Sequence, residues 1–262
     1  MHHLLPLRSL PKMPLESPKV VRVLDTIRFK HYEKDDWGEF LWFIREYPRI
    51  YRYHFMNVQH RLKCIHKQYT TFHAAFSGKL SEAGDEMFQI KLSDETVYSI
   101  YWDFEALLNA VSSGLDVLAR ILSTAYKGDI LSKFEKLARK DDFGGYSALL
   151  QKARSSWVKH LKDYRNCFVH STSVDTLLSC SCTRYSNGWQ VRCKLPINPN
   201  TRDIVYFRWS RQCEVLQKAI AIYRHWVALD RRIAIQLERD FRAGIYPVRT
   251  ENLFAHLSNM QN

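Results

Sequence analysis

The 262-residue chain is predicted to be mainly α-helical, an up-and-down helical bundle with a β-hairpin at about 174–195 before its last long helix. Two observations predict this class. In four long segments apolar residues recur at steps of three and four, which places them on one face of a helix. Two runs rich in β-forming residues flank Ser186-Asn187-Gly188, and Asn-Gly between such runs is a strong hairpin signal.

The first elements are predicted from local alternation and from helix breakers. Residues 20–29 alternate loosely between apolar and polar types and are interpreted as a short strand. A helix that starts near Asp35-Asp36 is expected to end at Pro48, because proline cannot continue a helix interior. A cleaner apolar stripe predicts a helix from Val58 that ends at Ser77-Gly78.

The remaining helices carry wider apolar stripes. One is expected at 96–128, with enough apolar positions for a deeply buried helix. A short helical piece at 130–138 leads to an amphipathic helix at 149–170, and the last long helix is predicted at 206–241. We therefore expect one bundle at 51–245 with a C-terminal tail at 246–262. Residues 1–50 form an N-terminal extension packed on the bundle, flexible over its first ~20 residues.

The composition favours a folded protein with a polyanionic partner. The chain has 39 Lys+Arg against 27 Asp+Glu, a formal net charge of +12, and 46% hydrophobic residues. That apolar content is enough for a core and excludes a disordered tail. The surplus of positive charge attracts phosphate backbones. The glycine-rich phosphate loops Gly-x-x-x-x-Gly-Lys-Ser/Thr and Gly-x-Gly-x-x-Gly do not occur, so a nucleotide cofactor is not indicated.

The compartment is expected to be the cytoplasm. Prolines interrupt the leucine-containing first residues, so these lack the apolar core of a signal peptide. No run approaches the ~18 uninterrupted apolar residues of a membrane helix, so no contact with a membrane is expected. The six cysteines are scattered along the chain, which is more typical of reduced thiols than of a disulfide framework.

Three cysteines around the predicted hairpin leave one metal alternative open. Cys180, Cys182 and Cys193 are three soft ligands for zinc, although structural zinc sites use Cys-x-x-Cys pairs and a fourth ligand. In the other interpretation alternate cysteines face the packed side of the hairpin. We expect no metal and no other cofactor.

The segment 164–170 combines chemistry-bearing residues at the C-terminal end of an amphipathic helix. Imidazole titrates near neutrality, so His170 is a candidate general acid and base. The planar guanidinium of Arg165 matches phosphate oxygens. Positions five apart in a regular α-helix are turned by roughly 140°, so the two groups share a face only if the last turn is distorted near Val169. The alternative is a solvated arginine that complements the helix dipole and a histidine that caps the helix.

The run Arg165-Asn166-x-x-x-His170 resembles the Arg-Asn-x-x-x-His form of the motif that marks the HEPN superfamily, all-α domains of which many are ribonucleases. The order of the helices is also similar, because the motif closes a helix that follows a long helix with Leu115-Asp116-x-Leu118-Ala119. The resemblance spans roughly 98–242. It implies a HEPN-like bundle and a metal-independent endoribonuclease that cleaves RNA by 2′-OH attack and leaves a 2′,3′-cyclic phosphate.

The resemblance also implies partners and residue roles. Two copies form a homodimer in which both motifs meet in one cleft, with Arg165 and His170 catalytic and Asn166 organising the cleft. Such domains frequently act in toxin–antitoxin or antiviral defence systems, so an antitoxin or regulatory protein is a candidate partner. One subgroup, paired with nucleotidyltransferases, continues the motif as His-x-Tyr, whereas Ser171-Thr172 follows here. A partner that modifies that tyrosine is therefore not expected.

Charge placement selects candidate RNA contacts. Residues 49–79 contain six Lys/Arg and no acid, and residues 152–165 contain five Lys/Arg and one acid. Glu105 and Asp116, on the long helix, are candidates to orient Arg165 or His170. For each of these residues the alternative is an ordinary solvated helix face, and the alternative function is a non-catalytic RNA-binding or protein-interaction bundle. The candidate RNA-binding residues are Arg61, Lys63, Lys67, Lys159 and Lys162.

Overall fold

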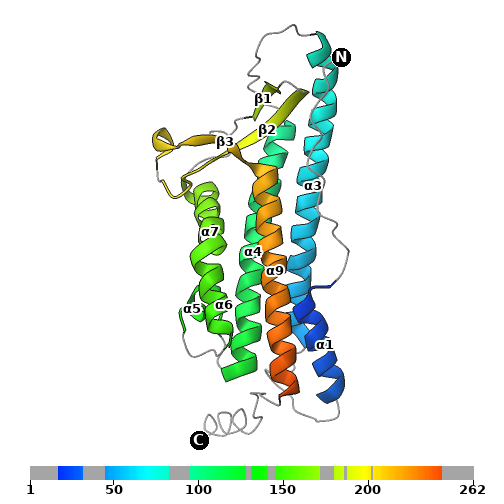
Figure 1. The fold of residues 1–262 in the computed structure, drawn as a ribbon, viewed down its shortest axis with the longest axis vertical. Coiled ribbons are helices and arrows are strands. Elements are labelled where there is room, and N and C mark those ends of the chain that lie inside the picture. The colour runs from blue at the N-terminus through cyan, green and yellow to red at the C-terminus, as the bar shows by residue number, and fades with distance from the viewer. Residues whose placement is uncertain are drawn as a thin grey trace, which may run out of the picture. The chain divides into compact units, whose positions relative to one another are not determined.

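The computed structural model describes residues 17–31, 45–82, 95–127, 131–140, 145–171, 180–185, 188–201 and 203–243. These residues are mainly helical with a small three-stranded antiparallel sheet, which confirms that the protein is mainly α (Figure 1). By packing, the chain falls into two compact units made of interleaved segments. Unit 1 comprises Met1–Leu15, Asn57–Ala110 and Lys159–Arg224, and unit 2 comprises Glu16–Met56, Val111–Val158 and His225–Asn262.

Three long helices contribute residues to both units. They are α3 (Tyr47–Glu82), α4 (Glu95–Lys127) and α9 (Val215–Arg242). The apolar stripes that predicted α4 and the body of α3 are buried, which confirms both helices. In the part of the chain that the structure describes, one stretch, Val97–Ala125 of α4, is long and apolar enough to cross a membrane, and 67% of its most apolar window is buried inside the protein.

The ends of α3 differ from the prediction. Pro48 does not end a helix but lies in the first turn of α3, where a residue without an N–H costs no helical hydrogen bond. The helix also continues through Ser77-Gly78 to Glu82, so the predicted stop was wrong. The helix expected to start near residue 35 lies outside the described residues.

Unit 2 is built around a buried tryptophan. Trp226 of α9 packs against Tyr51 and Phe55 of α3, with ring centroids 5.8 and 4.9 Å away. Gly114 of α4 allows this packing, because a Cβ atom there would lie 2.7 Å from Cζ2 of Trp226. The other elements of this unit are α1 (Lys19–His31), α5 (Phe134–Leu137), α6 (Gly145–Ala153) and a π-helix at Arg154–Val158.

The strand predicted at 20–29 is wrong, because this segment is the helix α1. Val20, Val21 and Leu24 are fully buried at a helical spacing. The carboxylate of Asp230 on α9 accepts the backbone N–H groups of Lys19 and Val20, at 2.7 and 3.3 Å. A residue more than two hundred positions away therefore caps α1, which a local pattern does not reveal.

Unit 1 carries the sheet. Strands β1 (Cys180–Tyr185) and β2 (Gly188–Pro196) pair antiparallel, which confirms the predicted hairpin. A third strand, β3 (Trp209–Glu214), pairs with β2 and leads directly into α9. The helix predicted from residue 206 was wrong over β3, because this segment pairs with a strand from elsewhere in the sequence. A short 3-10 turn, Ile204–Tyr206, precedes β3.

Candidate active site

The helix that carries the motif ends in the distortion that its spacing predicted. Helix α7 (Lys159–Asn166) continues as a π-helix over Cys167–Ser171, so the expected distortion near Val169 is confirmed. Hydrogen bonds in a π-helix join residues i and i+5, as those of an α-helix join i and i+4. The backbone therefore turns positions 165 and 170 nearer to a common face than a regular α-helix does. The side chain of His170 lies outside the described part of the chain.

Arg165 is held by an amide on the long helix α4. Its side chain is half-buried, and its Nε donates a hydrogen bond of 2.9 Å to Oδ1 of Asn109. This bond orients the guanidinium through one edge, while the terminal nitrogens carry the fork that matches two phosphate oxygens. Asn109 therefore fixes the orientation of the Arg165 guanidinium.

Aromatic packing anchors the motif helix on both sides of Arg165. Tyr164 and Phe168 lie one turn apart and are buried. Both pack on Phe104 of α4, at 6.2 and 5.8 Å between ring centroids, and Phe168 also packs on Tyr101 at 6.3 Å. This packing restrains the helix end from which the motif side chains project.

The hydroxyl of Tyr164 links the motif helix to the sheet. It donates a 2.8 Å hydrogen bond to the carbonyl oxygen of Pro196 at the end of β2, and it lies 3.1 Å from Sγ of Cys213 on β3. Burial and the hydrogen bond with Cys213 raise the pKa of the Tyr164 phenol well above its usual range. The phenol therefore stays protonated and acts as a structural donor rather than as a proton-transfer group.

Asn109, rather than either of the two candidate acids, contacts Arg165. Asp116 belongs to unit 2, where its carboxylate accepts the backbone N–H of Phe134 at 2.9 Å and lies 3.3 Å from Nζ of Lys133. It therefore fixes the start of α5. Glu105 is half-buried on α4, one turn before Asn109. Sequence reasoning missed Asn109, although this polar residue lies four positions after Glu105, on the same side of the predicted helix.

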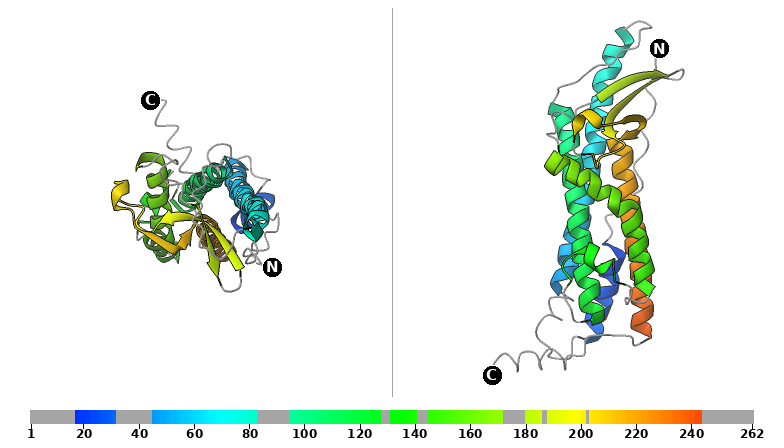
Figure 2. Two further views of the ribbon diagram at one scale, coloured as in Figure 1. Left: turned by 90° about the horizontal axis from the view of Figure 1, so that it is seen from above. Right: turned by 90° about the vertical axis from the view of Figure 1, so that its left-hand side faces the viewer.

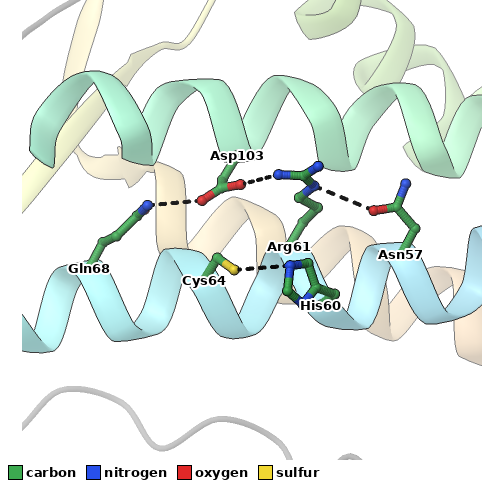
Figure 3. A network of polar contacts seen from close by, with 6 residues as sticks. All are labelled: Asn57, His60, Arg61, Cys64, Gln68 and Asp103. Atoms are coloured by element: carbon green, nitrogen blue, oxygen red, sulfur yellow. Dashed lines mark hydrogen bonds and ion pairs between the residues drawn. The ribbon is translucent and has the colours of Figure 1, made fainter. Parts of the chain in front are cut away.

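A polar network joins α3 to α4 in unit 1 (Figure 3). Arg61 forms a 2.7 Å ion pair with the buried carboxylate of Asp103, which also accepts a 2.9 Å hydrogen bond from Gln68. Nε of Arg61 donates to Asn57 at 3.4 Å. Arg61 is therefore already paired with an acid of unit 1, whereas Lys63 and Lys67 on the same helix are exposed.

Cys64 and His60 approach each other beside this network without forming an activated nucleophile. Sγ of Cys64 lies 3.5 Å from Nε2 of His60. Partial burial and the Asp103 carboxylate raise the pKa of Cys64, and the neighbouring Arg61 and Lys67 only partly oppose this shift. A protonated thiol is a weak nucleophile, so the pair does not supply covalent chemistry at neutral pH.

The remaining candidates divide between the motif helix and the hairpin. On α7, Lys159 and Asn166 are exposed and Lys162 is half-buried. In the hairpin, the strand register sets Cys180 opposite Cys193, whose side chain is buried. The side chains of Cys180 and Cys182 lie outside the described residues. Among the residues that are described, no cluster of three or more His, Cys, Asp or Glu is arranged to hold a metal ion.

Comparison of the chain with protein-family models, with curated proteins and with solved structures finds no match. The features of the described residues that bear on function are the arginine held by Asn109, the aromatic anchor around it, and the π-helix that follows.

Proposed function

We propose that the protein is a HEPN-type endoribonuclease in which Arg165 and His170 are the catalytic pair and Asn166 organises the cleft. The observation that carries this proposal is the π-helix at Cys167–Ser171. A regular helix would separate the arginine and the histidine around its axis, and this distortion turns their positions toward one side. The Asn109 hydrogen bond to Arg165 supports the same assignment.

The proposed reaction uses the RNA's own 2′-hydroxyl as the nucleophile. His170 accepts the 2′-OH proton as the 2′-oxygen attacks the adjacent phosphorus. The new O2′–P bond forms, the P–O5′ bond breaks, and the 5′-oxygen takes a proton from solvent. Arg165 stabilises the additional charge on the pentacoordinate phosphate. The products are a 2′,3′-cyclic phosphate and a 5′-hydroxyl, and the family resemblance implies that no metal is needed.

The wider proposal follows the same resemblance. Two copies of the chain form a dimer with both motifs in one cleft, and the enzyme acts as a toxin or a phage-defence effector held in check by an antitoxin or regulatory protein. A second candidate function, a non-catalytic RNA-binding or protein-interaction bundle, is favoured by the exposed Lys63, Lys67 and Lys159. These side chains bind phosphate without needing the motif.

The test is cleavage of a labelled single-stranded RNA in excess EDTA by the wild-type protein and by the Arg165→Ala, His170→Ala and Asn109→Ala variants. The matched controls are His160→Ala, an exposed histidine on the motif helix, and Arg139→Ala, an exposed arginine in unit 2. We expect wild type and controls to leave cyclic-phosphate ends, and Arg165→Ala and His170→Ala to lose cleavage while RNA affinity survives. Loss of Asn109 misplaces the arginine and should slow cleavage about tenfold to hundredfold.

The outcomes separate the two candidate functions. Binding of RNA by the wild-type protein without cleavage would favour the binding module. Equal cleavage by all variants would assign the activity to a contaminant and would contradict the roles of Arg165 and His170. A strict monomer in light scattering, at the protein concentration that cleaves RNA, would contradict the shared cleft.

A further inference from the structure

The β2–β3 connection and the first residue of β3, residues 197–201 and 203–209, expose several large apolar side chains. Val205 is 80% exposed, Tyr206 68%, Ile197 48% and Trp209 42%. Single exposed apolar residues are ordinary, but a contiguous group of them marks an interaction surface. We call Tyr206 and Trp209, with their exposed neighbours, the aromatic platform.

One side chain fixes the backbone of this connection. The carboxamide of Asn198 donates hydrogen bonds to Oγ1 of Thr201 at 2.8 Å and to the carbonyl oxygen of Tyr206 at 3.0 Å. Its Oδ1 accepts the N–H of Arg208 at 2.7 Å, and the N–H of Ile197 donates to the carbonyl oxygen of Arg208 at 2.9 Å. The aromatic platform is therefore ordered before any partner arrives, which lowers the entropic cost of binding.

The exposed ring of Trp209 packs on a buried neighbour. Trp209 packs edge to face with Phe207, with ring centroids 6.2 Å apart and an interplanar angle of 86°. Phe207 itself is buried. Phe207 thus holds Trp209 in a defined orientation while a large part of the indole stays accessible.

The platform is attached to the helix that carries the catalytic motif. The connection begins just after Pro196, whose carbonyl accepts the Tyr164 hydroxyl, and it ends in β3, whose Cys213 touches the same hydroxyl. Tyr164 is the residue before Arg165. Figures 1 and 2 show the β2–β3 connection projecting beside the C-terminal end of α7. The β2–β3 connection and the motif helix therefore belong to one packed part of unit 1.

We propose that the aromatic platform binds unpaired RNA bases by stacking, with Tyr206 and Trp209 as the stacking residues. This inference rests on the proposed function and adds the class of substrate, a single-stranded RNA whose bases are accessible. Unpaired bases stack on Tyr and Trp side chains while nearby cations contact the phosphates. The exposed Arg208 lies between the two rings in the sequence, and Lys218 of α9 lies over the Tyr164 ring at 5.4 Å. The charge of +12 also favours nucleic acid over a neutral or basic protein partner.

The experiment measures the fluorescence anisotropy of a labelled 12-nucleotide oligouridine in EDTA. All proteins are full length and carry Arg165→Ala, so that the probe stays intact. The test variants are Tyr206→Ala and Trp209→Ala, and Tyr206→Phe and Trp209→Phe keep a ring for stacking. The matched control is Tyr53→Ala, an equally exposed tyrosine in unit 2. Circular dichroism verifies that each variant keeps the parent's helical content.

We expect each alanine variant to bind the RNA about five- to a hundredfold more weakly, as loss of one stacked base predicts. The phenylalanine variants and Tyr53→Ala should bind like the parent. Unchanged affinity of both alanine variants, equal losses in the phenylalanine variants, or an absence of RNA binding by the parent would each overturn the proposal. A changed oligomeric state with unchanged RNA affinity would also overturn it and would instead identify an interface between copies.

The failure of this inference is distinguishable from that of the proposed function. If cleavage requires Arg165 and His170 while Tyr206→Ala and Trp209→Ala bind RNA normally, the platform proposal alone is wrong. If the platform variants lose RNA affinity while the wild-type protein does not cleave, the nuclease proposal alone is wrong.

Discussion

Asp230 is a buried carboxylate whose chemistry is set by its surroundings. It is 2% exposed and accepts the backbone N–H groups of Lys19 and Val20. Burial raises its pKa to about 6, although these two hydrogen bonds favour the charged form. Burial and the neighbouring Asp230 also raise the pKa of the Tyr51 phenol. At the residue scale, a side chain that organises α1 is therefore costly to keep ionised.

This pKa predicts a dependence of stability on pH. The folded-state pKa of about 6 lies above the ordinary value of 3.8, so the folded protein binds the extra proton between these values. The stabilising contribution of protonated Asp230 is fully present below about pH 4 and is lost as the pH rises through about 6. Relative to Asp230→Asn, the free energy of unfolding of the wild type should fall by up to about 3 kcal/mol across this window.

Denaturant unfolding at several pH values measures this difference. Because both proteins share every other titrating group, their difference isolates Asp230. A difference between wild type and Asp230→Asn that stays constant from about pH 4 to about pH 7 would contradict the prediction.

At the scale of elements, the packing of α4 on α9 in unit 2 depends on a missing side chain. Gly114 faces the indole of Trp226, which is fully buried and in contact with Tyr51 and Phe55. A glycine in a helix interior normally lowers stability by about 0.5–1 kcal/mol relative to alanine. At this position the packing of Trp226 outweighs that cost. The indole has little room to move because its neighbours are also buried.

Gly114→Ala is accordingly expected to destabilise the protein. The new Cβ would lie 2.7 Å from Cζ2 of Trp226, and such overpacking costs about 1–3 kcal/mol, more than the helix gains. Thermal unfolding measures the effect. Ser113→Ala, the exposed neighbouring position, is the matched control and should leave the melting temperature nearly unchanged or slightly higher. An increase in melting temperature for Gly114→Ala would show that the Trp226 side chain moves to accommodate the new methyl group, and it would contradict the prediction.

Across the whole molecule, the net charge of +12 includes cations that are paired with acids and cations that are exposed to solvent. Arg61 is paired with Asp103, whereas Lys63 and Lys67 are exposed on the same helix. Only cations that reach phosphate release counterions and contribute to the salt dependence of RNA binding. Residue type alone therefore overestimates how many cations are accessible to a polyanion.

The double variant Lys63→Gln/Lys67→Gln is expected to bind single-stranded RNA more weakly. Its logarithmic salt slope should become shallower by about 0.7 for each phosphate that the protein no longer neutralises. Arg231→Gln/Arg232→Gln removes the same charge from exposed positions of unit 2 and serves as the control. Anisotropy titrations at several salt concentrations measure both slopes, and parallel curves for the two double variants would contradict RNA binding through Lys63 and Lys67.

Local patterns predicted most of the fold, and they failed where distant residues decide. The apolar stripes of α4 and α9 and the Asn-Gly hairpin were read correctly because their signals lie within each element. The pattern of residues 20–29 is compatible with both a strand and a helix. The segment is a helix, and Asp230 accepts a backbone N–H group at its start. Residues 209–214 form a strand because β2 pairs with them.

Periodicity and composition were enough to predict the helical class and the basic surplus, and the spacing of Arg165 and His170 predicted the distorted helix end. Contacts between elements set which polar residue holds Arg165, that Arg61 pairs with Asp103, and that Tyr206 and Trp209 are exposed. The difference arises from how far along the chain each interaction acts. Periodicity and turn chemistry act over a few residues, whereas hydrogen-bond partners and burial depend on which elements meet in space.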